Sequence, residues 1–356
     1  MRAVMESPFR FPVHACRRLG DTAGRIGGTV HSDVHPVMIG TVDGSTTAAS
    51  VVPCPAAGRQ PVGDCADGGG LVSDPMLIWK GKNADQRLFW SRAHSDGSWR
   101  DQQQVRYFAT NRGGIGAASD GRLTARAAWR GADDDSRIWT AGWYGDGWSD
   151  QQTPVDAPRT EDRPALAFHD DRTVMAWRGV GPDQTIWFSE NLGPQRVAGG
   201  QASSTHGPAL ASYGGLLYMA WKGSGGDQGL YWTTYDGHTW AQPRPFPGGS
   251  THGPALAASP QALFLVWKGS GNDAGIWHAE FQNGRWSAQR PAPGGTSTGP
   301  SAAYVGNTVI TAWKGVGADA RMWTCRNFRE PQIAVANGAF GTSDTPAVVS
   351  TFVTEL

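Results

Sequence analysis

The sequence predicts an all-β chain that forms a β-propeller of four-stranded antiparallel blades, with six blades as the expected number. A tryptophan-centred pattern recurs six times within 356 residues. Each unit also supplies four short strand candidates, separated by turns rich in Gly, Pro, Asn and Asp. A four-stranded unit repeated every 40 to 50 residues or so is typical of this fold.

The repeated pattern is a tryptophan, a basic residue, a glycine, three variable residues, an aspartate, three variable residues and an aromatic ring. The tryptophans are Trp79, Trp129, Trp177, Trp221, Trp267 and Trp313, separated by 50, 48, 44, 46 and 46 residues. The basic residues are Lys80, Arg130, Arg178, Lys222, Lys268 and Lys314, and the aspartates are Asp85, Asp135, Asp183, Asp227, Asp273 and Asp319. The rings are Phe89, Trp139, Trp187, Tyr231, Trp277 and Trp323.

The fifth unit shows the four expected strands in order. They span residues 254–259, 262–268, 275–281 and 285–291. The first strand is built of small residues such as Ala255 and Ala257, which suit the crowded innermost position of a blade. The second is apolar on both faces, as expected for a sheet that packs between two neighbouring sheets.

The end of the chain predicts how the ring closes. A proline opens the first strand of a unit at Pro254 and Pro300, and the same step of 46 residues leads to Pro346. Because the first unit has no such strand directly before it, residues 346–350 are expected to complete blade one. A hairpin at 35–52, with an Asp-Gly turn, offers an alternative. If it pairs with the C-terminal strands, a seventh blade results.

The first 72 residues differ in kind from the propeller expected at 73–356. They are rich in Gly, Pro and Ser and lack tryptophan, so a partly disordered arm or a plug is expected. Cys54 and Cys65 share one loop and either form a disulfide or remain two thiols. With Cys16 and Cys325 they show no metal-ligand spacing, and neither a metal nor a cofactor is expected.

Composition argues against nucleic acid or a membrane as a partner. Lys and Arg number 31, as do Asp and Glu, so no net charge attracts either one. The apolar runs have the length of strands, which indicates a soluble protein. The N-terminus lacks the apolar core of a secretory signal. A cytoplasmic location and export by a non-standard route therefore both stay open, as does the oligomeric state.

Strand alternation predicts which loops share a face. The loops from second to third strands and those from one blade to the next must leave on the same side. His206 and His252 stand two residues before prolines in the second kind of loop, and Asp162, Thr298 and Asp344 match them. This face is therefore the expected functional face, while the Asp-Gly turns of the opposite face resemble ordinary hairpin turns.

Each repeated residue has a structural interpretation beside the functional one. The cation and the aspartate could form a cross-strand ion pair, the first tryptophan could be core, and the histidines could hold their loops. The residue after the ring varies most, which suits an exposed rim or a specificity position. Its six members are Trp90, Thr140, Phe188, Trp232, His278 and Thr324.

A cation, a carboxylate and a ring on one rim are what weak sugar recognition needs. The charged groups hydrogen-bond vicinal hydroxyls, and the ring packs against the C–H face of the sugar. Several such sites raise avidity by roughly 10² to 10⁴. The candidate ligand-binding residues include all cations and aspartates of the pattern and all its rings except Phe89. Trp90, Trp232, His206 and His252 are further candidates. No catalytic residue is assigned.

The tandem units over 73–356 resemble the β-propeller lectins of bacteria and fungi, both fucose-lectin-like and Photorhabdus-type, and bacterial propellers with WKG repeats. In such lectins the sugar sits between or beside blades, held by an Arg or Lys, an acidic or amide residue and a Trp or Tyr. The resemblance implies glycans or glycoconjugates as partners. It gives this role to Lys222, Asp227, Tyr231 and Trp232, and to Lys268, Asp273 and Trp277.

Other functions stay open. Residues 9–12, FRFP, are similar to the F-R-I-P motif of sialidases, which implies that Arg10 would bind a substrate carboxylate. The Asp boxes of that family, S-x-D-x-G-x-x-W, are absent. A propeller enzyme that acts on a small molecule through its central channel, or a protein-interaction scaffold, are the further alternatives.

Overall fold

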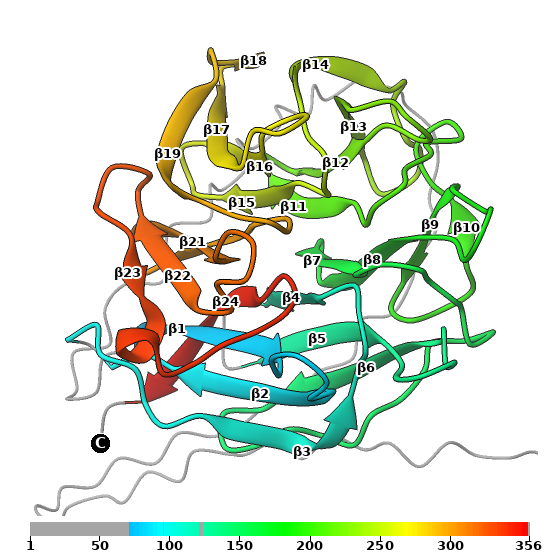
Figure 1. Ribbon diagram of the computed structural model, residues 1–356. Helices are drawn as coiled ribbons and strands as arrows, with labels where there is room; N and C mark the ends of the chain where they lie inside the picture. Colours follow the sequence, from blue (N-terminus) through cyan, green and yellow to red (C-terminus); the bar gives the residue numbers. More distant parts are fainter. Residues whose placement is uncertain (1–70, 95, 121–123, 355–356) are drawn as a thin grey trace, which may run out of the picture. The chain divides into compact units, whose positions relative to one another are not determined.

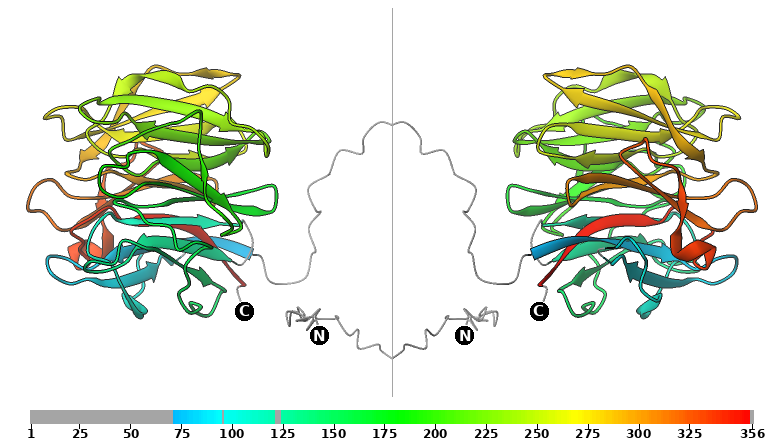
Figure 2. Two further views of the ribbon diagram at one scale, coloured as in Figure 1. Left: turned by 90° about the vertical axis from the view of Figure 1, so that its right-hand side faces the viewer. Right: turned by 90° about the vertical axis from the view of Figure 1, so that its left-hand side faces the viewer.

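The computed structural model describes residues 71–94, 96–120 and 124–354. Within this part of the chain, six antiparallel sheets surround a common axis as the blades of a propeller (Figure 1). Seen edge-on, their strands run between the two faces of the ring (Figure 2). The predicted fold class and blade number are thus confirmed.

The blades follow one another along the chain. Blade one contains β24 (Ala347–Thr354), β1 (Leu71–Lys80), β2 (Arg87–Arg92) and β3 (Gln103–Ala109), and blade two contains β4 (Ile115–Ser119), β5 (Ala125–Arg130) and β6 (Ile138–Trp143). Blade three contains β7 (Ala165–His169), β8 (Arg172–Arg178), β9 (Ile186–Glu190) and β10 (Arg196–Val197). Blade four contains β11 (Ala209–Tyr213), β12 (Leu216–Lys222), β13 (Gly229–Tyr235) and β14 (Arg244–Gly249).

Blades five and six complete the ring. Blade five contains β15 (Ala255–Ala258), β16 (Leu263–Lys268), β17 (Gly275–Gln282), β18 (Arg285–Trp286) and β19 (Arg290–Gly295). Blade six contains β20 (Ser301–Val305), β21 (Thr308–Lys314), β22 (Met322–Arg326) and β23 (Ile333–Ala334), followed by a short 3₁₀ helix, η1 (Val335–Gly338). The expected fourth strand at 285–291 is split into β18 and β19, an irregularity that outer strands with prolines tolerate.

The C-terminal strand closes the ring as predicted. β24 pairs with β1 along its length, so the first blade combines the two ends of the propeller. The described residues form no seventh sheet. The alternative hairpin at 35–52 and the rest of the N-terminal segment lie outside the described residues.

Small residues line the axis because six strands converge there. The innermost strands β24, β4, β7, β11, β15 and β20 each lie against the next one round the ring. At Gly116 the approach is so close that a Cβ atom would stand 1.9 Å from the carbonyl oxygen of Pro164. Only glycine fits this backbone contact.

The core lies between the blades. All six tryptophans that begin the repeat are buried, at 3% exposure or less, which confirms their core interpretation. They pack against the strands of adjoining blades, so each blade completes the core of its neighbour. Over the described ranges there is no helix with the length and apolar character needed to cross a membrane.

Candidate ligand-binding sites

Hydrogen bonds between loops confirm which loops share a face. The Nζ atom of Lys222, where strand two of blade four ends, donates to the Oγ1 atom of Thr205 at 2.7 Å. Thr205 belongs to the loop that enters the same blade, 17 residues earlier. Lys268 with Thr251, and Lys314 with Ser297, repeat this bond in blades five and six. Both kinds of loop therefore lie on one face, as strand alternation predicts.

The repeated cations are internal braces. Lys80, Arg130, Arg178, Lys222, Lys268 and Lys314 are all buried, at 7% exposure or less. Each donates to backbone carbonyl oxygens of its own loop, as Lys268 does to the carbonyl of Asp273 at 3.0 Å. No ion pair joins such a cation to the carboxylate of its own repeat in the described part of the chain. Burial lowers the pKa of the four lysines.

The repeated aspartates organise the loop instead. In four blades the Oδ2 atom accepts a hydrogen bond from the indole Nε1 of the tryptophan four residues later, at 2.7–3.0 Å. Asp227 accepts the same bond from the Tyr231 hydroxyl. Asp85 precedes Phe89, which has no donor, and binds Arg87. Hydrogen bonds from Arg321 lower the pKa of Asp319 to about 2.

The six rings of the pattern differ in how far they are exposed to solvent. Trp139, Trp187, Tyr231, Trp277 and Trp323 are half-buried, whereas Phe89 is buried. In blades one, two and six an arginine two residues before the ring lies over its face: Arg87, Arg137 and Arg321. Thr185, Gly229 and Gly275 occupy this position in blades three to five. Trp187, Tyr231 and Trp277 therefore present faces that no arginine of their own repeat covers.

The variable residue after the ring faces the next blade. In blade one, Trp90 packs against Trp143 with ring centroids 4.5 Å apart. Trp232 of blade four packs against Phe281 and Trp286 of blade five. Both Trp90 and Trp232 are buried, at 8% exposure, so the structure does not place these candidate contacts on an exposed rim. Phe188 fills the equivalent interface between blades three and four.

A cleft remains where this position holds histidine. His278 stacks on Phe328 of blade six, with centroids 4.1 Å apart and planes within 8°. Beside them lies a cavity of about 770 Å³, lined also by Phe264, Glu280, Arg290, Pro291, Val309, Asn327, Arg329 and Glu330. Burial, and next the charge of Arg290, lower the pKa of His278 to about 4, so the ring is neutral at physiological pH.

A second cleft follows where the position holds threonine. Thr324 of blade six lines a cavity of about 330 Å³ together with Pro75, Ala93, Asp96, Gly97, Trp99, Ile310, Arg326, Glu330 and Ile333. The two clefts flank the turn at 326–330, which joins β22 to β23. Such turns lie on the opposite face, where the sequence predicts ordinary hairpin turns and no ligand site. The cleft residues were missed. A small or polar residue after the ring marks both clefts, but it is not sufficient as a signal, because Thr140 of blade two holds the same position and is fully buried.

His206 and His252 lie on the axis of the first face. Their ring centroids are 5.1 Å apart. With Asp162, Thr298 and Asp344, from the matching loops, they line a cavity of about 280 Å³. The equivalence of these five positions in the sequence thus predicts a real grouping.

The cysteines and the other candidate metal ligands are described only in part. No group of metal-ligating side chains occurs among the described residues. Cys325 is a buried free thiol, and burial raises its pKa to about 11. Three other cysteines lie outside the described residues: Cys16, Cys54 and Cys65. Arg10, which carries the similarity to sialidases, also lies outside them.

Comparisons with known proteins support the fold. No family model and no curated protein matches the chain. A fungal lectin from Aleuria aurantia, described as a six-bladed β-propeller with a novel fucose recognition mode, is 11% identical, with a TM-score of 0.51 over 75% of this chain and 97% of that one. AofleA from Arthrobotrys oligospora is 11% identical, with a TM-score of 0.51 over 80% of this chain and 90% of that one. A single-residue variant of the Aleuria lectin in complex with Fucα1-6GlcNAc gives 12% identity, a TM-score of 0.50 and coverages of 76% and 96%.

Proposed function

We propose that this propeller binds carbohydrate, without chemical conversion, in the two clefts that flank blade six. The observation that carries the proposal is the contrast between blade interfaces. Large aromatic side chains close the interfaces after blades one, three and four, whereas His278 and Thr324 leave hollows after blades five and six. Because bulky rings fill the equivalent position in three blades of the same ring, the fold itself does not require a small or polar residue there.

The cleft beside His278 carries groups suited to a sugar. Arg290, Arg329 and Glu330 are exposed, and Glu280 is half-buried. Guanidinium and carboxylate groups form charge-assisted hydrogen bonds with hydroxyls that point in different directions. Phe264 supplies an apolar wall for the C–H face of a ring. Mixed polar and aromatic lining of this kind is typical of small-ligand sites.

Structural similarity supports the choice of ligand class. The propellers of similar fold include the Aleuria aurantia lectin, described with a fucose recognition mode and also, as a variant, in complex with Fucα1-6GlcNAc. At this identity the likeness covers the fold, and it makes fucosides the first probes for this chain. Glycans and glycoconjugates are accordingly the proposed partners.

The open rings of the first face are a secondary contact in this proposal. Tyr231 and Trp277 each present a half-exposed face with a carboxylate fixed at the edge, from Asp227 and Asp273. Such units bind a sugar weakly, and several on one rigid ring add avidity. The buried cations contribute by holding the loops and make no contact with the ligand.

A glycan array with purified protein, followed by calorimetric titration of the best ligand, tests the proposal. His278→Trp and Thr324→Trp would fill the clefts with the side chain that already closes other interfaces. Each substitution should remove one site, and the double variant should lose at least about tenfold in affinity. Tyr144→Ala, which removes an exposed ring outside both clefts, is the matched control and should keep the wild-type affinity. Unchanged binding by a folded double variant would overturn the proposal.

A further inference from the structure

We propose a second ligand site on the axis of the first face, for a polyhydroxylated ring about the size of one monosaccharide. It occupies the cavity of about 280 Å³ lined by Asp162, His206, His252, Thr298 and Asp344, here called the axial cup. The cup and the clefts lie on opposite faces and share no residue. Each of the two proposals can therefore be tested independently of the other.

The loops that build the axial cup have one common scaffold. A fully buried hydroxyl group precedes each innermost strand. It stands four residues before the proline that opens the strand, or before the glycine in its place. These residues are Thr110, Thr160, Ser204, Ser250, Thr296 and Thr342. Each hydroxyl bonds the backbone two residues further on, as Ser250 does with both the N–H and the carbonyl of His252. The loop conformation is thus fixed from within, whatever side chain faces the axis.

The side chains on this scaffold differ from blade to blade. In chain order they are Arg112, Asp162, His206, His252, Thr298 and Asp344. The structural parts of the repeat keep their residue type, whereas these positions hold basic, acidic, imidazole and hydroxyl groups at equivalent backbone sites. The buried hydroxyls hold these loops in every blade, so the loop conformation does not by itself explain the variety of the six side chains.

The polar groups of the axial cup are already oriented. Asp162 accepts hydrogen bonds from the backbone N–H groups of Arg163 at 2.7 Å and Gly207 at 2.9 Å. A carboxylate has about four acceptor positions, so acceptor capacity remains. Thr205 and Thr251 hydrogen-bond the Nδ1 atoms of His206 and His252, at 3.1 and 3.0 Å, which leaves each Nε2 available. Preorganised groups bind at a smaller ordering cost.

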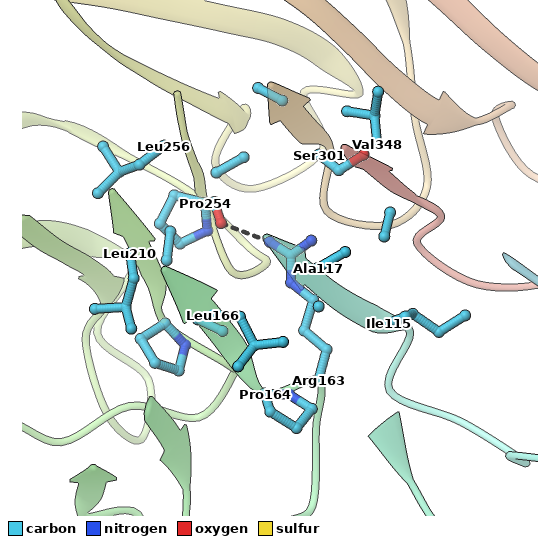
Figure 3. Close-up of a pocket in the computed structure, with 17 residues that line it drawn as sticks. Ile115, Ala117, Arg163, Pro164, Leu166, Leu210, Pro254, Leu256, Ser301 and Val348 are labelled. Atoms are coloured by element: carbon cyan, nitrogen blue, oxygen red, sulfur yellow. Dashed lines mark hydrogen bonds between the residues drawn. The ribbon is translucent and has the colours of Figure 1, made fainter. Parts of the chain in front are cut away.

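The basic groups near the axial cup are occupied. Arg163, which also lines the cup, donates to the carbonyl oxygens of Pro254 (Figure 3) and Pro300, two prolines that open innermost strands. Arg112 pairs with Glu161 at 2.6 Å. The groups of the cup that can still form hydrogen bonds are carboxylates and imidazoles, which come from several directions. A ring with several hydroxyl donors matches this lining, whereas an anion would meet two carboxylates.

Titration followed by the imidazole ¹H–¹⁵N signals of His206 and His252 tests the site directly. The probes are myo-inositol and methyl glycosides, with methylammonium and acetate as charged comparisons. We expect hydroxylated probes to shift both signals, with affinity lowered at least about tenfold in Asp162→Asn. Affinity should be unchanged in Tyr144→Ala, whose exposed side chain lines neither the cup nor the clefts. His252→Phe keeps a ring but loses the nitrogens, so it should also weaken binding, and it replaces Asp162→Asn if that variant fails to fold.

Three results would overturn the axial site. One is the absence of a shift with every hydroxylated probe. Another is a shift with methylammonium or acetate alone, which would assign the cup to an ion. The third is wild-type affinity in folded Asp162→Asn and His252→Phe variants. None of these outcomes bears on glycan binding in the clefts, which the tryptophan variants measure.

Discussion

At the scale of the residue, the repeated cation shows what spacing in a sequence can and cannot reveal. A cation and an aspartate five residues apart predict an ion pair or a shared ligand contact. The structure instead ties Lys222 to Thr205 and Asp227 to Tyr231. The partner of the lysine comes from a loop that becomes a neighbour only after the blade has folded. The position of the cation is visible in the sequence, but its partner is not.

Removing one buried cation should therefore cost stability. Lys268→Met leaves the carbonyl oxygen of Asp273 and the hydroxyl of Thr251 without the Nζ donor, while the carbonyl oxygen of Gly269 keeps only its bonds from Thr251. We expect a loss of about 1–3 kcal/mol in the free energy of unfolding, measured with urea. Arg321→Ala is the control: that exposed side chain should matter little. Equal losses in the two variants would contradict the bracing role.

Three neutral histidines predict a pH dependence of stability. Burial lowers the pKa of all three side chains, His206, His252 and His278. For His252 and His278 the pKa falls to about 4. The charged groups facing them are Asp162, Arg163, Arg178, Lys222, Lys268, Arg290 and Arg329. The unfolded chain takes up protons near pH 6.5 and the folded chain does not, so stability should fall from about pH 6.5 towards pH 4.

Thermal unfolding across this range measures the effect. The slope of the melting temperature against pH should be smaller in His252→Gln, which cannot take up the proton in either state. A slope identical to that of the wild type would mean that His252 does not titrate differently in the two states.

At the scale of the element, one position on the third strand shapes the interface with the next blade. The sequence marks this position as variable, and strand alternation predicts that it points away from the preceding ring. It does not reveal that the direction is towards the next blade, because this depends on how the sheets stack. Trp90 and Trp232 consequently pack in the core, while His278 borders a cleft.

Truncation at this position should separate the two roles. Trp232→Ala removes a side chain that packs against Phe281 and Trp286, and should cost about 3–5 kcal/mol. His278→Ala loses one stacking contact beside an existing cavity, so a smaller loss is expected together with weaker glycan binding. Urea unfolding and calorimetric titration of both variants check this. A larger stability loss in His278→Ala than in Trp232→Ala would be the contrary result.

At the scale of the whole molecule, closure was the most predictable feature. The regular steps between prolines lead to Pro346, and β24 does complete blade one. The grouping of His206, His252 and Asp162 on one face also follows from alternation alone. The clefts could not be predicted, because a cavity depends on side-chain volumes from two blades at once.

A chain ending at Thr345 tests closure. Without β24, Met76 and Leu77 of blade one lose their inner partner strand and become exposed. We expect a lower melting temperature and a broader transition, with recovery when a peptide covering 346–354 is added. Scattering from the truncated chain should show an opened ring. Unfolding at the wild-type temperature without the peptide would contradict the closing role of β24.

Crystals grown with the best ligand from the glycan array test the central claim most directly. Sugar density should lie in the clefts beside His278 and Thr324, on either side of the turn at 326–330, and should be absent where Trp90, Phe188 and Trp232 close the interfaces. Density confined to the Asp–ring pairs of the opposite face, or an array without any bound glycan, would contradict it.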